Sequence, residues 1–166
     1  MITKRLIKSF FILTIVVINI GCDQVSKKIV RQNIQPYETI RLLSNHVTVT
    51  RVENTGAFLS AGDSLPKTLK HILLSLIPMI VLALAAVYVF SKQALSHTML
   101  IGFCFVIGGG IGNIFDRMVY GSVTDFLHIN FGIFQTGIFN LADVSIMIGV
   151  SLILLYSLRK GKRIMS

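Results

Sequence analysis

Two aspartates stand in apolar surroundings where a charge is expensive. Asp125 lies in the segment Val-Thr-Asp-Phe, and Asp143 is the one charged residue between His128 and Arg159. A carboxylate in a stretch apolar enough to cross a bilayer is rare and usually functional. Two carboxylates brought together in a low-dielectric place do not both ionise easily, and a shared proton suits acid–base hydrolysis. Glycines between the two positions allow the chain to fold back and bring them together.

The composition indicates an integral membrane protein. Of the 166 residues, 53% are hydrophobic and only 14% are charged, whereas a soluble domain carries roughly 25% charge. The apolar residues are also gathered in long runs, each close to the ~20 residues that a helix needs to cross the hydrocarbon core. We therefore predict one membrane domain, residues 1–166, with four transmembrane helices at about 6–22, 72–90, 94–115 and 138–158.

The two longer connections are expected to lie on one side of the membrane. Residues 23–71 are the most polar section, and β-branched residues alternate after Asn45, which is typical of a strand. Residues 118–137 are predicted to be a loop. The predicted fold class is therefore an all-α integral membrane protein of four transmembrane helices, with a small extracytoplasmic β-sheet element between helices one and two.

The positive charges favour cytoplasmic termini. Four helices place both termini on one side, and each side then holds eight of the 16 Lys and Arg residues, while all seven acids lie on the other side from the termini. The rule that positive loops stay inside counts Lys and Arg, so the counts tie. We place the termini in the cytoplasm because their positive charges flank the helices tightly.

Other polar residues beside apolar or glycine-rich segments can be interpreted as either structural or functional. An amide there can hold a substrate carbonyl or amide through hydrogen bonds, or it can cap a turn or helix; these amides are Asn54, Asn113 and Asn140. Arg117 can pair with Asp116 as a local anchor or lean towards an anionic group. On physical grounds alone, Asp23 and Lys27, four positions apart, read as a helix-stabilising pair.

Other reaction chemistries find little support in the sequence. The four histidines are scattered, so we expect no metal site and no cofactor. No serine or cysteine stands in a motif typical of an activated nucleophile. An aspartyl mechanism is what the residue types allow.

Five motifs, taken together and in order along the chain, resemble those of bacterial lipoprotein signal peptidase, the signal peptidase II family. The resemblance covers essentially the whole chain. The motifs are Asp23-Gln24-x-Ser26-Lys27, Asn54-x-Gly56-Ala57-Phe58, Gly112-Asn113-x-x-Asp116-Arg117, Val123-x-Asp125-Phe126 and Phe139-Asn140-x-Ala142-Asp143.

The resemblance implies an intramembrane aspartic endopeptidase with Asp125 and Asp143 as the catalytic pair. Its substrates would be diacylglyceryl-modified prolipoproteins, cut just before the lipidated cysteine, and globomycin-like antibiotics would inhibit it. It would lie in the bacterial inner membrane among membrane lipids, with the active site near the outer face. The resemblance also implies substrate-binding residues Asn54, Gly56, Asn113, Arg117 and Asn140, and supporting residues Asp23, Lys27 and Asp116.

The main alternative is a small transporter or channel subunit, because intramembrane acids often mark ion paths. A conducting path needs polar groups in the cytoplasmic half as well, and the inner halves of helices two and four have almost none. A catalytically dead scaffold is a third reading, and the intact aspartate pair argues against it.

Overall fold

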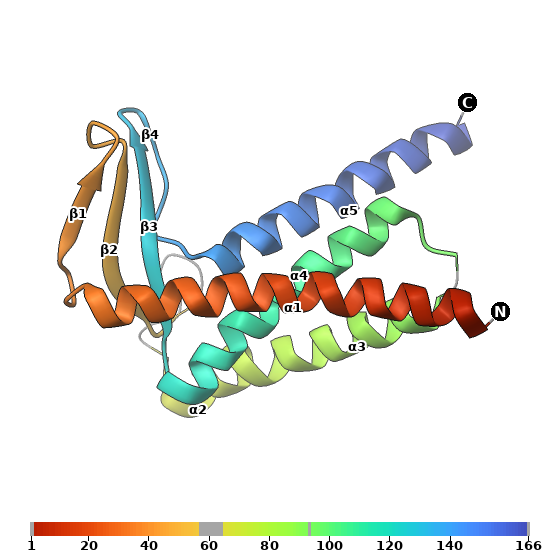
Figure 1. Cartoon of the computed structure of the whole chain (residues 1–166), viewed down its shortest axis with the longest axis horizontal. Coiled ribbons are helices and arrows are strands. Elements are labelled where there is room, and N and C mark those ends of the chain that lie inside the picture. Colours follow the sequence, from red (N-terminus) through yellow and green to blue (C-terminus); the bar gives the residue numbers. More distant parts are fainter. Residues whose placement is uncertain (1, 57–64, 93, 166) are drawn as a thin grey trace.

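The computed structural model describes residues 2–56, 65–92 and 94–165. Within these ranges, four helices are long and apolar enough to cross a membrane, and a four-stranded antiparallel sheet stands at one end of them (Figure 1). The predicted fold class is confirmed. The elements in order are α1 (Ile2–Asn33), β1 (Thr39–Leu42), β2 (Val47–Asn54), α2 (Lys67–His71), η2 (Ile72–Leu76), α3 (Ile77–Ser91), α4 (His97–Tyr120), β3 (Val123–Phe131), β4 (Phe134–Gln135) and α5 (Leu141–Met165).

The first helix extends far beyond its apolar run. It has 32 residues, about 48 Å at 1.5 Å per residue, against a hydrocarbon core of roughly 30 Å. Its last turns therefore leave the apolar region and reach the sheet, where Val30 and Ile34 pack with Phe126. Residues 23–33, placed by the sequence in the β-containing segment, are helical, and Asp23, Lys27 and Arg31 on one face of this stretch have buried partners.

The sheet combines two distant parts of the chain. Its strand order is β1-β2-β3-β4, and β2 pairs antiparallel with β3 so that Val49 faces Leu127 and Asn54 faces Val123. Residues 118–137, predicted as a loop, thus contain the last turn of α4 and two strands. Asp125 pairs with Val52, so Asn54 lies diagonally across from it on the adjacent strand, two positions along.

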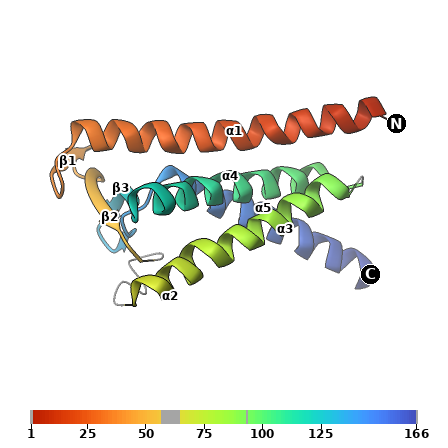
Figure 2. The same cartoon turned by 90° about the horizontal axis from the view of Figure 1, so that it is seen from below.

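Helix α4 lies in the middle of the bundle and packs against α1, α3 and α5 (Figure 2). Its glycines allow two of these approaches. A Cβ atom at Gly108 would lie 2.7 Å from Cβ of Asn19 on α1, and one at Gly109 would overlap the carbonyl oxygen of Ala142 on α5. Small residues of this kind let membrane helices come close.

The end of the bundle near the termini is held mainly by apolar packing. Side chains of α1, α3 and α4 form one buried cluster there: Ile12, Val89, Leu100, Cys104 and Ile107. Lys8 adds a polar contact, because its Nζ donates to the carbonyl oxygens of Val89 and Lys92 at the end of α3. This end of the molecule therefore supports the helices and carries little polar chemistry.

Candidate active site

Asp125 is buried on β3 and receives two amide hydrogen bonds. Asp125 is only 5% exposed. Asn54 Nδ2 donates to Asp125 Oδ2 at 2.9 Å, and Asn140 Nδ2 donates to Asp125 Oδ1 at 2.6 Å. Each carboxylate oxygen therefore has a fixed donor, which orients the plane of the carboxylate.

Asp143 lies in the first turn of α5 and is tied to the same asparagine. Asn140 and Asp143 bond reciprocally, because the backbone N–H of Asn140 donates to Asp143 Oδ2 at 3.2 Å and that of Asp143 donates to Asn140 Oδ1 at 3.0 Å. This is the arrangement of a capping box at a helix start. Asn113 Nδ2 donates to Asp143 Oδ1 at 2.8 Å. Asn140 thus bridges both carboxylates, and the structure brings Asp125 and Asp143 together.

The orientation of each asparagine amide follows from the donor on its oxygen. Asn54 Oδ1 accepts the backbone N–H of Gly56 at 2.9 Å, and Asn113 Oδ1 accepts from Lys27 Nζ at 2.9 Å. The oxygen of Asn140 is occupied by the N–H of Asp143. Because each oxygen already faces a donor, each NH₂ group faces a carboxylate. The three asparagines predicted from the sequence therefore act as rigid donors at one place.

Burial raises the pKa of Asp125 to about 6. The hydrogen bonds from Asn54 and Asn140 favour the ionised form and lower this pKa, whereas the nearby charge of Asp143 raises it. A carboxyl group that titrates near 6 exchanges a proton close to neutral pH, which is what general acid–base chemistry needs. Asp125 lies on β3, outside the membrane-spanning helices.

A second, fully buried group of charges supports Asn113. Lys27 Nζ lies 2.9 Å from Asp23 Oδ2 and 2.9 Å from Asp116 Oδ2, and all three side chains have no exposed area. With Asn113 as the third acceptor, all three hydrogens of the ammonium group are used. Asp23 and Lys27 are thus more than the local helix pair that the spacing alone suggests.

The same group also fixes the start of α5. Asp23 Oδ1 accepts the backbone N–H of Ala142 at 2.9 Å, and Ala142 directly precedes Asp143. Gly112 makes room for this carboxylate, because a Cβ there would lie 2.5 Å from Asp23 Oδ2. The charges on α1 and α4 are therefore connected to both the backbone and the side chain that position Asp143.

Arg117 turns towards the loop after β2. Its NH2 group donates to the carbonyl oxygen of Gly56 at 3.0 Å. Among the described residues, Asp116 pairs with Lys27 and with Arg31, at 3.5 Å for the latter, and not with Arg117. The local Asp116–Arg117 pair considered from the sequence is therefore not formed. Ala57 and Phe58, the end of the second motif, lie outside the described residues.

Several polar residues at this site were assigned no role from the sequence, although Gln24 stands in the first motif. Gln24 Nε2 donates to Asp23 Oδ2 and to Asp116 Oδ1, both at 3.1 Å. Arg31 donates to the buried Thr124 hydroxyl at 2.9 Å. The spacing of 23, 27 and 31 along one helical face was the available signal, and it predicts a shared direction without naming the partners.

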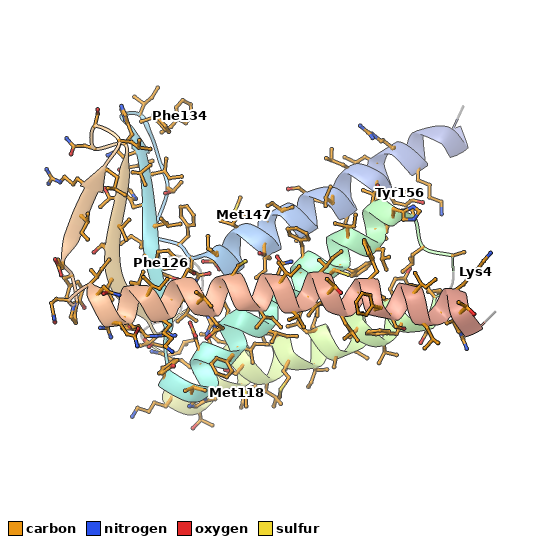
Figure 3. All side chains as sticks on the ribbon, viewed as in Figure 1. Lys4, Met118, Phe126, Phe134, Met147 and Tyr156 are labelled. Carbon is orange, nitrogen blue, oxygen red and sulfur yellow. The ribbon has the colours of Figure 1, made fainter. Side chains whose placement is uncertain are left out.

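A long apolar groove opens beside Asp143. It has a volume of about 760 Å³ and runs between the segment after β3 and one side of α5, on which Met147 lies (Figure 3). Besides Asp143, its walls include Phe139, Val144, Met147, Ile148 and Leu152. A group with apolar chains can thus lie against α5 while its polar end reaches the carboxylates.

A protein-family model described as signal peptidase (SPase) II matches residues 15–159. The chain belongs to the signal peptidase II family. Two similar proteins named lipoprotein signal peptidase come from Borrelia turicatae, 33% identical over 93% of this chain and 92% of the relative, and from Streptococcus pneumoniae, 31% identical over 92% and 95%.

Solved structures give the same result for the fold. A bacterial membrane enzyme determined by the in meso method at 2.3 Å resolution is 28% identical, with a TM-score of 0.82 over 92% of this chain and 90% of that chain. A second, at 1.9 Å resolution, is 30% identical with a TM-score of 0.79 over 89% and 92%.

Membership of the signal peptidase II family identifies the chain as an aspartic endopeptidase that removes signal peptides from prolipoproteins. It is a multi-pass membrane protein. The alternative of a transporter or channel subunit is not favoured. Within the described ranges, no group of three or more His, Cys, Asp or Glu side chains is arranged to hold a metal ion.

Proposed function

We propose that Asp125 and Asp143 are the catalytic pair of this signal peptidase. The observation that carries the proposal is the bridge through Asn140, which donates to one oxygen of each carboxylate. Asn54 donates to the other oxygen of Asp125, and Asn113 donates to the other oxygen of Asp143. Pre-set donors of this kind cost no reorganisation during reaction. The pair acts on diacylglyceryl-modified prolipoproteins and cleaves the peptide bond just before the lipidated cysteine.

In the proposed reaction, one carboxylate takes a proton from water and the other, protonated, polarises the scissile carbonyl. The water oxygen bonds to the carbonyl carbon while the protonated aspartate gives its proton to the carbonyl oxygen, and a gem-diol forms. The aspartate that took the proton from water then passes it to the amine nitrogen of the cysteine as the C–N bond breaks. A gem-diol hydroxyl returns its proton to the other aspartate, which leaves the new carboxyl group and restores the pair. The scheme needs one proton on the pair at the start, and it runs with either aspartate as the acid.

The remaining residues are assigned by what they contact. Asn54, Asn113 and Asn140 orient the carboxylates and offer amide groups to the substrate backbone. Arg117 and Gly56 form the rim of the site, because the guanidinium holds the Gly56 carbonyl. The buried charges support the site through two hydrogen bonds: Lys27 donates to Asn113, and Asp23 accepts the N–H of Ala142. Asp116 holds Lys27 in place.

The apolar groove beside Asp143 is the proposed place for the diacylglyceryl group. Most of its exposed lining is apolar, with Met147, Ile148 and Leu152 of α5 along one wall. Lipid chains buried there supply binding energy that holds the peptide bond at the carboxylates. Globomycin-like inhibitors, which must compete for the same carboxylates and chains, are expected to occupy this groove too.

The proposed orientation places both termini in the cytoplasm and the carboxylates near the outer face of the inner membrane. The termini lie together at one end of the helices, with the sheet at the other (Figure 1). Arg159 and Lys160 at the end of α5, and Lys4 and Lys8 on α1, make the terminal end strongly positive, which favours the cytoplasmic side.

The test is a gel-shift assay of signal-peptide removal from a diacylglyceryl-modified prolipoprotein by purified protein in detergent. Asp125→Asn and Asp143→Asn are each expected to lower the rate by at least about 10²–10⁴-fold, the usual contribution of a general acid or base. Glu38→Gln, which neutralises an exposed acid near β1, is the matched control and should cleave normally.

Thermal melting of each variant separates lost chemistry from lost folding, and a chelator arm tests metal dependence. Substantial turnover by both folded Asp→Asn variants would refute the catalytic pair. Loss of wild-type cleavage in the chelator would refute a metal-independent mechanism.

A further inference from the structure

A β-bulge interrupts the pairing of β2 with β3 just before the site. Val49 pairs with Leu127. The next pair is Val52 with Asp125, so two residues of β2 stand opposite one residue of β3. An extra residue on one strand reverses which of its side chains lie on each face of the sheet. Past the bulge, Asn54 therefore lies on the same face as Asp125.

The ladder beyond the bulge is short. It consists of three pairs, and the last of them is Asn54 with Val123. Pairing at the end of a strand opens more easily than pairing in its middle. The hydrogen bond from Asn54 to Asp125 crosses this short ladder, so its geometry depends on what else holds the two strand ends together.

The opposite face of the same ladder carries a group of polar side chains, here called the back-face cluster: Arg31, Arg51, Glu53, Ser122 and Thr124. At its centre, the Thr124 hydroxyl accepts from Arg31 Nη1 at 2.9 Å and lies 3.1 Å from Oε2 and 3.2 Å from Oε1 of Glu53. A hydroxyl has one hydrogen to donate, and here it faces the Glu53 carboxylate. Thr124 is fully buried, so water does not compete for these contacts.

Glu53 has two further donors in the cluster. The Ser122 hydroxyl donates to its Oε2 at 2.8 Å, and Arg51 Nε donates to its Oε1 at 3.2 Å. Arg51 also donates to the backbone oxygen of Arg31 at 3.1 Å, and the Arg31 guanidinium lies 4.2 Å from the centre of the Tyr120 ring. The back-face cluster therefore joins β2 and β3 to the last turns of α1, which lie against both strands (Figure 1).

We propose that Thr124 is a positioning residue. Its hydroxyl joins α1 to β2 behind the sheet, and this holds the ends of β2 and β3 at the offset that lets Asn54 donate to Asp125. Successive side chains of a strand point to opposite faces, so Thr124 acts through the backbone and does not touch the carboxylate. Valine would fill the same volume without a hydroxyl to satisfy, so packing alone gives no reason for a threonine here.

The test is the titration of Asp125 in the full chain in detergent, followed by NMR of carboxyl-labelled aspartate. The chain has five aspartates, and the Asp125 signal is the one that Asp125→Asn removes. A hydrogen bond to the ionised form favours that form. Thr124→Val should therefore raise the pH of half-titration, in the same direction as Asn54→Ala and by no more than that variant.

The double variant Asn54→Ala/Thr124→Val should titrate like Asn54→Ala alone, because the second change acts through a bond that is already lost. The charged groups that act on Asp125 are Lys27 on α1, Arg117 on α4 and Asp143 on α5. The substitution alters none of them, so a shift reports the position of Asn54.

Two control variants separate positioning from packing. Thr124→Ser keeps the hydroxyl and should titrate like wild type. Thr48→Val makes the same substitution on the same face of β2 before the bulge, opposite His128, and should change nothing. In the cleavage assay, which rests on the proposed catalytic pair, Thr124→Val should lower kcat by up to about 10²-fold, the effect of a misplacement of ~1 Å. KM should change little, because Thr124 does not line the substrate groove.

A wild-type titration in folded Thr124→Val would overturn the proposal, as would a double variant whose shift is the sum of the two single shifts. An equal shift in Thr48→Val would also overturn it. If melting shows that Thr124→Val does not fold, Glu53→Ala removes the same contact from a side chain that is 33% exposed and must give the shift instead. Cleavage by both folded Asp→Asn variants would refute the catalytic pair and leave the titration result standing, so the two failures are distinguishable.

Discussion

The two ends of the helix bundle are held together by different interactions. At the sheet end, fully buried charges on α1 and α4 satisfy one another through Lys27, Asp23 and Asp116. At the other end, the corresponding helices meet through aliphatic side chains such as Ile12 and Leu100. The polar end stabilises the fold and orients the carboxylates with the same contacts, so a change there affects both stability and activity. The apolar end contributes to stability alone.

The largest expected effect comes from removing the charge at the centre of the polar end. Lys27→Met leaves Asp23 and Asp116 buried without their counter-ion, and breaking a buried pair in this way costs about 3–5 kcal/mol. It also removes the donor that orients the Asn113 amide towards Asp143. We expect a large fall in melting temperature together with loss of cleavage by the fraction that remains folded.

Lys28→Met is the matched control, because Lys28 is the exposed neighbour on the same helix. It should change neither property appreciably. Normal cleavage by Lys27→Met would contradict a joint structural and positioning role for the buried charges, even if its melting temperature fell.

A smaller effect is expected where α4 and α5 touch, between the two ends. In Gly109→Ala, the added methyl group would overlap the backbone oxygen of Ala142, which cannot move without shifting the start of α5. Overpacking of this kind costs about 1–3 kcal/mol. Because Asp143 follows Ala142, we expect the cleavage rate to fall more than the stability loss explains.

Gly110→Ala provides the comparison. Its methyl group would meet the end of the Leu82 side chain, at 2.6 Å from Cδ1, and a side chain can change rotamer. It should melt and cleave close to wild type. Equal rates for the two folded variants would show that the α4–α5 contact does not position Asp143.

The sequence was most informative about the apolar helices and the carboxylates. Long apolar runs predict membrane helices because the bilayer sets their length. Asp143 stands out because a charge in such a run is rare. The end of α1 was harder to predict from the sequence. The residues after Cys22 look like a polar segment, and their burial depends on partners on α4 that lie about 90 positions away along the chain.

Only part of the sheet was predicted from the sequence, for a similar reason. The alternation after Asn45 indicates β2, whereas β3 is stabilised by pairing with β2 across a long sequence separation. Strand pairing depends on such non-local contacts more than on local preference. The roles of Asn54, Asn113 and Asn140 as matched donors also depend on which group meets each amide oxygen, and a single sequence does not contain that information.

The most local change concerns the proton on Asp125. Its pKa is raised to about 6 by burial, and the hydrogen bond from Asn54 opposes that rise. Asn54→Ala removes a donor to the ionised carboxylate. A hydrogen bond to a charged group contributes about 1.5–3 kcal/mol, and one pKa unit corresponds to about 1.4 kcal/mol. The pKa should therefore rise by about one to two units, so Asp125 keeps its proton to higher pH.

The dependence of kcat/KM on pH reports this step in the free enzyme. We expect the wild-type profile to have a limb near pH 6, and we expect this limb to move to higher pH in Asn54→Ala. The control is Asn33→Ala, which loses an exposed hydrogen bond to the Ile29 carbonyl and should leave the limb in place. A limb that rises with pH identifies Asp125 as the base, and one that falls identifies it as the acid. A lower plateau with an unmoved limb would mean that Asn54 serves substrate binding and leaves the proton on Asp125 unaffected, which would separate the two roles that the polar end of the bundle combines.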